Sequence, residues 1–252
     1  MRNNQYSAIV RMWQGWHVSS APDIDLRLHN FKILFAFNSG KIENEEITYH
    51  DTREIFETGK AINFTGDPRA LFEQRNQKLC YEFLKEKIVC REPLTIRLVL
   101  ETHGVLTGGT YDERRFVEQG ERPGTFKRHD YVTGREEVGS APEDVQGDME
   151  ALLKEINDFV EGDILKAAAY FHLRFEYIHP FADGNGRVGR ILLNYFLMTR
   201  GQPPIIVYDD DKAAYYAALE AYDKFEDIML MYNFLLRQLE RTWEKALERK
   251  SH

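Results

Sequence analysis

Apolar residues recur at helical spacing along most of this chain. The clearest case is the set Ile164, Ala168, Phe171, Phe175 and Ile178, whose steps alternate between four and three, so that one face of a helix points to a core. The same spacing predicts further helices over residues 42–59, 68–89, 149–156, 211–222 and 226–247, and another through Leu94, Leu98 and Val99, with Pro93 in its first turn. The pattern predicts an all-α fold.

Two stretches interrupt this pattern. After the apolar segment 31–37, the residues Asn38, Ser39 and Gly40 predict a break. Residues 108–147 are rich in glycine, proline and charge, and carry β-type residues around 131–135. This composition predicts a loop that contains a small hairpin.

The chain shows no internal repeat and no low-complexity linker. We divide it into an N-terminal helical region (1–92), a core (93–205) and C-terminal helices (206–252), which we expect to form one compact domain.

Composition narrows the class of protein. The 252 residues carry a net charge of −8, which is no electrostatic footprint for nucleic acid. The two cysteines, Cys80 and Cys90, argue against a disulfide scaffold or a zinc module and suit a reducing compartment. No apolar run is long enough to span a bilayer, and the first twenty residues lack the apolar core of a signal peptide. We therefore expect a cytoplasmic protein that binds neither nucleic acid nor membrane.

Candidate chemistry is concentrated in twelve residues, 179–190, directly after the 164–178 helix. His179 can take a proton at neutral pH, which suits it to deprotonate an attacking hydroxyl. On its own, a histidine at this position is better explained by the helix dipole, and the neighbouring residues favour the catalytic interpretation. Asp183 offers a hard oxygen ligand for Mg²⁺, or alternatively caps the next helix.

An anion site is predicted after Asp183. Gly184, Asn185 and Gly186 precede a helix that we expect to begin near Arg187, so that backbone N–H groups and the Asn185 amide can approach an anion. Arg187 and Arg190 share one helix face and suit successive phosphates. The spacing of Gly184, Gly186 and Gly189 also matches a dinucleotide fingerprint, but the preceding segment has helical and not strand periodicity, so we reject that interpretation.

At these residues the sequence resembles the Fic family, whose signature is HxFx(D/E)GNGRxxR. Every specified position matches, namely His179, Phe181, Asp183, Gly184, Asn185, Gly186, Arg187 and Arg190. The resemblance extends from about residue 38 to the C-terminal helices and implies an all-α Fic (Fido) fold with a β-hairpin flap, which we place at about 126–138. It also implies transfer of AMP from ATP to a Ser, Thr or Tyr hydroxyl of a protein, with Mg²⁺ bound and pyrophosphate released.

The resemblance assigns roles residue by residue. His179 would be the base, and Asp183 would hold Mg²⁺ at the α- and β-phosphates. Gly184, Asn185 and Gly186 would line the anion hole. Arg187 would neutralise the β-phosphate and Arg190 would reach the γ-phosphate. Tyr215 and Tyr216 resemble a tyrosine pair near the adenine, although packing explains them nearly as well.

A second resemblance concerns regulation. The family's inhibitory helix carries (S/T)xxxE(G/N), and residues 39–44 match it with Ser39, Glu43 and Asn44. A serine and a glutamate four apart lie on one helix face, here within about 38–48. Glu43 would pair with Arg190 and deny that arginine to the γ-phosphate, as in the class whose N-terminal inhibitory helix lies in the same chain.

The sequence therefore predicts an autoinhibited protein adenylyltransferase. Two alternatives stay open: removal of AMP from a modified protein with the help of Glu43, and a non-catalytic nucleotide-sensing module. The target protein is not specified, and self-modification is one option. Relatives use dimer surfaces to regulate the inhibitory helix, but no patch in this sequence specifies a homo-oligomer.

Overall fold

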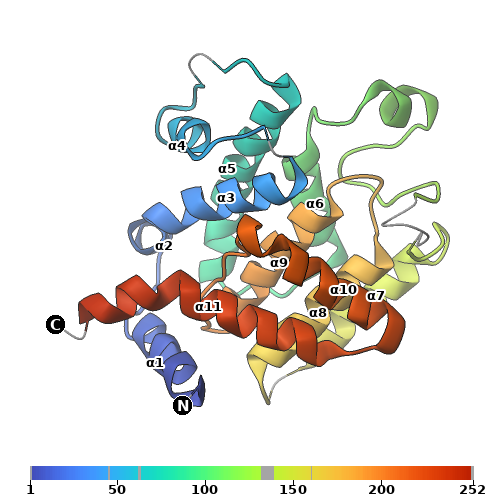
Figure 1. The fold of residues 1–252 in the computed structure, drawn as a ribbon. Coiled ribbons are helices and arrows are strands. Elements are labelled where there is room, and N and C mark those ends of the chain that lie inside the picture. The colour runs from blue at the N-terminus through green and yellow to red at the C-terminus, as the bar shows by residue number, and fades with distance from the viewer. Residues whose placement is uncertain (1, 45, 62–63, 132–138, 160, 251–252) are drawn as a thin grey trace.

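The computed structural model describes residues 2–44, 46–61, 64–131, 139–159 and 161–250, and this part of the chain is helical without a β-strand (Figure 1). The helices in chain order are α1 (Arg2–Gln14), α2 (Ala21–Arg27), α3 (His29–Glu43), α4 (Tyr49–Thr58), α5 (Pro68–Val89), α6 (Ile96–Thr107), α7 (Val145–Asp158), α8 (Ile164–Ile178), α9 (Asn185–Thr199), α10 (Lys212–Phe225) and α11 (Ile228–Lys250). Two short elements, a π-helical turn at Arg114–Glu118 and a 3₁₀ turn at Asp209–Asp211, complete them.

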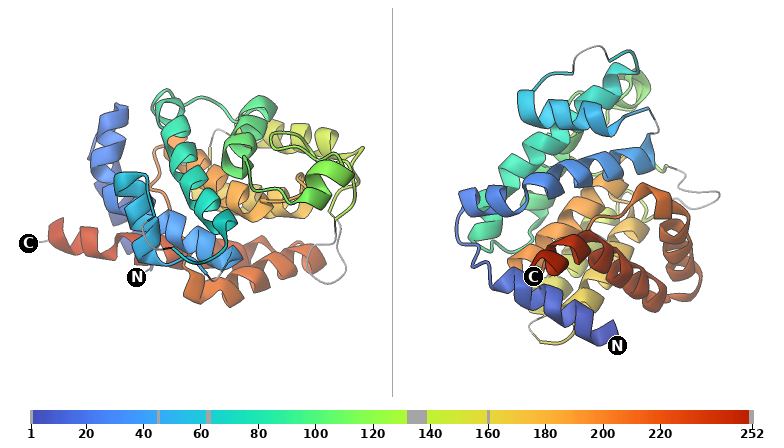
Figure 2. Two further views of the ribbon diagram at one scale, coloured as in Figure 1. Left: turned by 90° about the horizontal axis from the view of Figure 1, so that it is seen from above. Right: turned by 60° about the vertical axis from the view of Figure 1, so that its left-hand side comes forward.

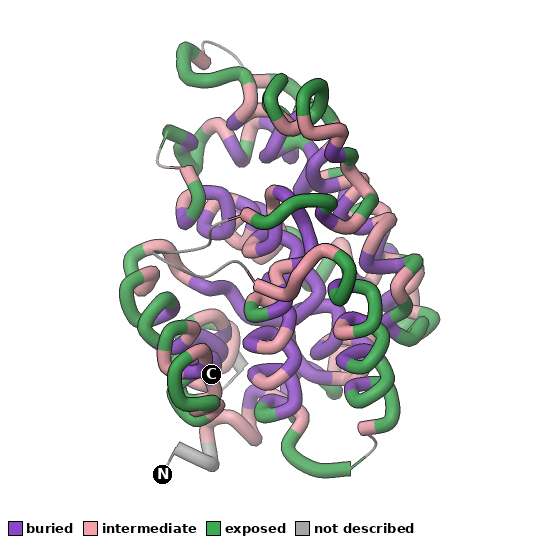
Figure 3. The backbone as a smooth tube through the Cα atoms, turned by 90° about the vertical axis from the view of Figure 1, so that its right-hand side faces the viewer, coloured by how far each residue is buried: buried purple, intermediate pink, exposed green. Residues whose placement is uncertain are grey.

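The centre of the molecule is the pair α8 and α9. Helix α8 packs on α9, α7 and α11, while α9 also contacts α3, α5 and α6. Their facing side chains, among them Phe171, Phe175 and Phe196, are fully buried. Figure 3 shows buried residues concentrated in the interior of the molecule, with the exposed ones on the outer turns. Apolar burial of this extent is the main source of stability for a helical fold.

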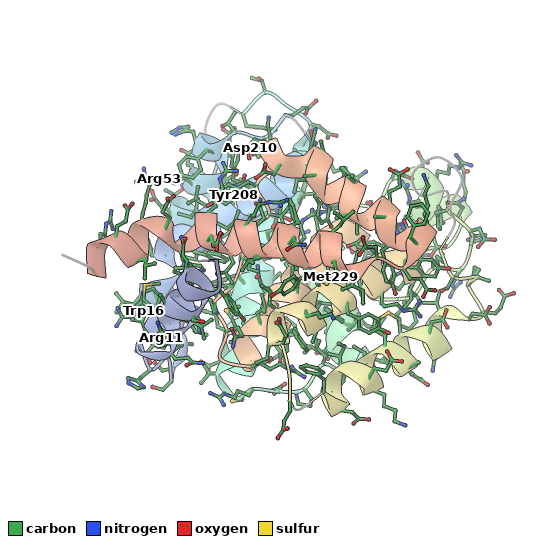
Figure 4. All side chains as sticks on the ribbon, turned by 60° about the horizontal axis from the view of Figure 1, so that its bottom comes forward. Arg11, Trp16, Arg53, Tyr208, Asp210 and Met229 are labelled. Atoms are coloured by element: carbon green, nitrogen blue, oxygen red, sulfur yellow. The ribbon has the colours of Figure 1, made fainter. Side chains whose placement is uncertain are left out.

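Aromatic residues pack the N-terminal helix α1 against the C-terminal helix α11. Trp13 and Trp16 lie 5.7 and 5.6 Å from Trp243, ring centre to ring centre, which joins α1 to α11. Arg241 of α11 lies over the ring of Tyr208 and pairs with Asp210. Figure 4 labels Tyr208 and Asp210, which lie along one side of α11. Helix α1 thus packs on α11, which in turn packs on α8.

Helix α3 corrects the sequence prediction. It continues through residues 38–40, where a break was expected, and ends at Glu43, so the inhibitory segment predicted at about 38–48 is helical only to residue 43. Gly40 is needed for close packing and not for a turn, because a Cβ there would lie 2.0 Å from the Gln74 amide nitrogen of α5. Asn38 accepts a hydrogen bond from the backbone N–H of Asp209. Tertiary contacts therefore override the local helix-breaking signal. Figure 2 gives two further views of α3 against α5.

Several other helix boundaries also differ from those predicted from the sequence. The pattern over 42–59 is divided between α3 and α4, because Asn44 is extended and Thr48 caps α4. Helix α6 begins at Ile96 behind the Thr95 cap, so Pro93 precedes the helix and is not in its first turn. Helix α9 begins at Asn185, two residues before the expected start. The predicted flap at about 126–138 falls largely on residues 132–138, outside the described part, and residues 126–131 contain no strand.

Candidate active site

His179 lies where α8 ends. Its backbone is left-handed (φ 50°), and its N–H still bonds the Phe175 carbonyl, so the chain turns sharply into the motif loop. The segments on either side of residues 128–139 are tied to this turn: Lys127 N–H donates to the Pro180 carbonyl, and Ser140 N–H donates to the Ile178 carbonyl. A non-glycine residue held in this conformation marks a position fixed by its surroundings.

The imidazole of His179 is neutral at physiological pH. Burial, then the nearby Lys127 ammonium, lowers its pKa from 6.5 to about 4. A neutral imidazole can accept a proton, so the electrostatics agree with a basic role for this side chain.

Helix α9 presents its N-terminus directly after Asp183. Gly184 is left-handed (φ 82°) and caps the helix without a side-chain hydrogen bond, so the first backbone N–H groups of α9 lack intrahelical partners. The side-chain amide of Asn185, which we expected to donate to an anion, instead bonds both the N–H and the carbonyl of Phe181. These two bonds hold the motif loop and use one of the two N–H groups of the side-chain amide, so a role of Asn185 toward an anion stays a prediction.

Asp183 and Arg187 belong to a charge network with α5. The Asp183 carboxylate lies 2.5 Å from Arg69 Nη2 and 3.7 Å from Arg187 Nη2. Glu73 lies 3.0 Å from Arg69 Nε and 2.8 Å from Arg187 Nη1. Sequence analysis missed Arg69 and Glu73, because a basic and an acidic residue four apart on a helix resemble any solvated pair. Two arginines and two carboxylates here neutralise one another next to the helix N-terminus.

Arg190 is held by α3. Its guanidinium is fully buried; Nε donates to Ser39 Oγ at 3.0 Å, and Nη2 donates to the Ser39 carbonyl at 2.9 Å and to Glu43 Oε1 at 2.8 Å. Burial acts to lower the pKa of Arg190, but Glu43 and its neighbours raise it above the ordinary value, so the charge is retained. The expected pair between Glu43 and Arg190 is present.

Gly186 permits this contact. A Cβ at residue 186 would lie 2.6 Å from Glu43 Oε1 and 3.0 Å from Arg190 Nη1. The glycine in the first turn of α9 therefore leaves the space that the Glu43 carboxylate fills. Where an anion would approach the backbone of α9, this carboxylate now lies close to it.

Tyr215 and Tyr216 point to different surroundings. Tyr215 is buried, its hydroxyl lies 2.8 Å from His172 Nε2, and its ring centre lies 5.8 Å from the Arg190 guanidinium carbon. The Tyr216 side chain is 47% exposed. The structure thus gives Tyr215 a packing role, and of the two only Tyr216 has a surface that a nucleobase could meet.

His103, on α6, was missed by sequence analysis and supports the motif loop. Its ring stacks on Phe181 at 3.7 Å, and its Nδ1 accepts from the Gly124 N–H, so Nε2 carries the proton that is donated to the Asp183 carbonyl. Burial lowers its pKa to about 4, so the ring stays neutral. No local pattern in the sequence distinguishes this histidine from the others.

Glu176, one turn before His179, is a second missed residue. Its Oε1 is buried and has no hydrogen-bond partner among the described residues, and a Cβ at Gly189 would lie 2.3 Å from it. Burial raises its pKa from 4.5 to about 8, with a further contribution from Glu43. Burial therefore favours the protonated form of Glu176, and Glu43 is the carboxylate that pairs with Arg190.

A metal would have few protein ligands here. The described residues contain no group of three or more His, Cys, Asp and Glu side chains arranged to hold an ion. Asp183 is a single carboxylate beside the N-terminus of α9, which fits Mg²⁺ because this ion commonly takes one carboxylate together with phosphate oxygens and water.

In the described part of the chain, no helix combines the length and apolarity that crossing a bilayer requires.

Comparisons with known proteins bear on the class of protein. The Fic/DOC family matches residues 93–197, which include the 179–190 motif. The chain is 29% identical over 221 residues to Protein adenylyltransferase Fic from Drosophila willistoni, covering 84% of this chain and 41% of the relative. It is 31% identical over 222 residues to the protein of the same name from Nematostella vectensis, covering 84% of this chain and 48% of the relative. The chain thus spans less than half the length of these curated relatives.

Solved structures share the fold. A Fic domain containing signaling protein from Bacteroides thetaiotaomicron superposes with a TM-score of 0.82 at 24% identity, over 98% of this chain and 95% of that one. Fic-1 from C. elegans gives a TM-score of 0.81 at 22% identity, over 99% of this chain and 73% of that one. The helices that precede residue 93 are therefore part of a fold that these two solved structures share.

Proposed function

We propose that this protein is an adenylyltransferase that moves AMP from ATP to a Ser, Thr or Tyr hydroxyl of a protein, and that Glu43 restrains it. The names of the curated relatives support the activity, and the Fic/DOC domain supplies the motif that it needs. The observation that carries the restraint is the threefold hold of α3 on the Arg190 guanidinium.

His179 starts the proposed reaction. The neutral imidazole takes the proton of the acceptor hydroxyl, the hydroxyl oxygen forms a bond to the α-phosphorus, and the bond from that phosphorus to the bridging oxygen breaks. Pyrophosphate leaves with the electron pair of the broken bond. The N-terminal N–H groups of α9 and the Arg187 guanidinium stabilise the charge on the departing oxygens. Asp183 would hold Mg²⁺, which neutralises phosphate charge when it is bound.

The restraint acts on the last phosphate. Arg190 is the arginine that lies one turn further into α9 from Arg187, so both can meet one triphosphate. While Ser39 and Glu43 occupy the Arg190 guanidinium, the γ-phosphate lacks that partner, and the Glu43 carboxylate beside Gly186 repels it. ATP then binds without the alignment that in-line transfer requires.

Transfer of label from ATP tests this proposal. The chain is incubated with Mg²⁺, ATP labelled at the α-phosphate and a crude protein extract, and intact mass reports modification of the chain itself. We expect Glu43→Gly to raise incorporation at least tenfold over wild type, and Glu43→Gly with His179→Ala to abolish it. Glu57→Gly, at an exposed glutamate of α4, is the matched control and should behave as wild type. Equal labelling with and without His179 would refute the base assignment.

A second candidate is removal of AMP. The Glu43 side chain remains 35% exposed, so a water molecule can lie against its carboxylate and be activated there. Incubating wild type with a protein that the Glu43→Gly variant has already modified tests this: release of free AMP by wild type, and none by the variant, supports removal. Retention of the label with both excludes it.

A further inference from the structure

The ion pair between Arg69 and Asp183 lies at the open edge of the charge network beside α9. The side chains of Arg69 and Asp183 are 35% and 20% exposed, whereas those of Arg187 and Glu73, which pair at 2.8 Å, are 3% and 7% exposed. Water screens an exposed ion pair, so breaking it costs little, while separating a buried pair leaves two uncompensated charges. Arg69 is therefore the cation of this network that can leave its carboxylate.

The position of Arg69 within its own helix does not explain why it is there. Arg69 is the second residue of α5, after Pro68, and the first turn of this helix contains no acidic residue. The helix dipole opposes a positive charge at a helix N-terminus. The partners of the guanidinium are instead Glu73, one turn further along α5, and Asp183, which is 114 residues away in the chain. The side chain of Arg69 is thus directed to the carboxylate that would hold Mg²⁺.

The Asp183 carboxylate cannot serve Arg69 and a divalent ion equally well. Arg69 Nη2 lies 2.5 Å from Asp183 Oδ2, and the same oxygen lies 3.7 Å from Arg187 Nη2. The charge of a guanidinium this close repels a divalent ion at the same carboxylate. Metal binding at Asp183 and the pair between Arg69 and Asp183 therefore oppose one another.

We propose that Arg69 occupies Asp183 in the resting protein and is exchanged for Mg²⁺ when a nucleotide arrives together with the ion. A phosphate oxygen accepts the released guanidinium, so both cations and both anions have partners after the exchange. Metal alone would gain the carboxylate but leave Arg69 with only Glu73. The pair thus makes metal binding depend on the nucleotide, and by linkage makes nucleotide binding depend on the metal.

This exchange rests on the proposed function for the placement of Mg²⁺ at Asp183, but its test needs no transfer of AMP. Mn²⁺ is the probe for the metal, because electron paramagnetic resonance counts the unbound ion. We expect Arg69→Gln to bind Mn²⁺ alone about fivefold more tightly than wild type, since the competing cation is gone. Arg69→Lys keeps the charge and should stay within about twofold of wild type.

Two controls locate the effect. Arg97→Gln removes one positive charge from an exposed pair of α6, so it matches the change in net charge and should bind Mn²⁺ as wild type does. Asp183→Asn, added to Arg69→Gln, should cancel the gain in affinity. Circular dichroism verifies that each variant is folded, and Arg69→Met repeats the measurement if Arg69→Gln is not.

The nucleotide gives a second readout of opposite sign. The complex of Mg²⁺ with α,β-methylene ATP, whose α–β bridge is not broken by transfer, is titrated into each protein in a calorimeter. We expect Arg69→Gln to bind this complex about tenfold more weakly than wild type, because a charge-assisted hydrogen bond to phosphate is lost. A merely structural role of Arg69 would weaken the binding of the metal and of the complex together.

Several results would overturn the inference. Unchanged Mn²⁺ affinity in Arg69→Gln, an equal gain in Arg69→Lys, or a gain that survives Asp183→Asn would contradict the competition at Asp183. Equal or tighter binding of the magnesium–analogue complex by Arg69→Gln would contradict the move of Arg69 to a phosphate. If the expected shifts are present and no variant transfers AMP, the result contradicts the proposed function and not the exchange.

Discussion

At the scale of single residues, the surroundings of the motif set the protonation of His179 and the hydrogen-bond partners of Arg190. Burial and Lys127 lower the pKa of His179, and Ser39 and Glu43 bind the Arg190 guanidinium. Glu176 keeps its proton, so it does not compete with Glu43 for the buried guanidinium. The hold on Arg190 therefore depends on one carboxylate, Glu43, that comes from α3.

The low pKa of His179 predicts a flat pH profile. Because the pKa is about 4, the imidazole is neutral throughout pH 6–8, and kcat/KM of Glu43→Gly for ATP should vary less than twofold across that range. If the imidazole had the ordinary pKa of about 6.5, only about a quarter of it would be neutral at pH 6, and kcat/KM would fall about fourfold. Initial rates at constant ionic strength distinguish the two, and a fourfold fall would contradict the environment described for His179.

The charge of Lys127 gives a related prediction. Burial is the larger cause of the lowered His179 pKa and Lys127 is the second, so Lys127→Met should raise the pKa while leaving it below 6.5. Titration of the His179 ring by NMR measures this directly. A pKa that does not move in Lys127→Met would mean that the two groups do not interact.

At the scale of elements, α3 and α9 meet through a glycine. Gly186 lies in the first turn of α9, where alanine would ordinarily favour the helix by up to about 1 kcal/mol. In wild type, however, the added methyl would meet Glu43 Oε1 at 2.6 Å and force it aside. Gly186→Ala should therefore weaken the contact between the two helices.

A double-mutant cycle measures that contact. We expect Gly186→Ala to be more favourable in the Glu43→Gly background than in wild type by about 1 kcal/mol in the free energy of unfolding. Urea denaturation of the four proteins gives the coupling, and Gly147→Ala, where a Cβ would meet nothing, serves as the control. Equal effects of Gly186→Ala in both backgrounds would show that the carboxylate does not fill the space beside residue 186.

Local pattern accounts for some elements and not others. Helix α5 has the predicted bounds, because Asp67 caps it, Pro68 opens it and apolar periodicity runs through it. Helix α3 was predicted to break at residues 38–40, but it continues through them. The polar and glycine residues there pack against α5 and hold Arg190, and a local pattern does not show such contacts. The motif itself was visible in sequence. Arg69 and His103 were not, because their roles depend on contacts across 114 and 80 residues of chain.

At the scale of the whole molecule, buried titratable groups make stability depend on pH in two windows. Burial lowers the pKa values of His103, His172 and His179 to about 4, 3 and 4. The unfolded chain therefore binds more protons than the native one below about pH 6.5, and the native state loses stability as the pH falls toward 4. Glu176 acts oppositely: its raised pKa gives stability that is present below about pH 4.5 and is lost as the pH rises through 8.

Glu176→Gln separates the two windows. Glutamine mimics the protonated acid at every pH, so the variant should gain stability relative to wild type as the pH rises from 4.5 to 8.5. Below pH 4.5 the difference between the two proteins should be constant, while both lose stability in acid because the histidines remain. Urea midpoints at five pH values test this, and a difference that does not depend on pH would contradict the protonated state assigned to Glu176.

Replacing Arg190 in a variant that lacks Glu43 tests most directly whether Glu43 acts through this arginine. Incorporation of AMP is compared between Glu43→Gly and the double variant Glu43→Gly with Arg190→Lys, which keeps the charge but lacks the guanidinium fork, after circular dichroism has shown both to be folded. If Glu43 acts by withholding Arg190, the double variant should fall back to the wild-type rate or below. A double variant as active as Glu43→Gly would contradict the claim that Arg190 is the group that α3 controls.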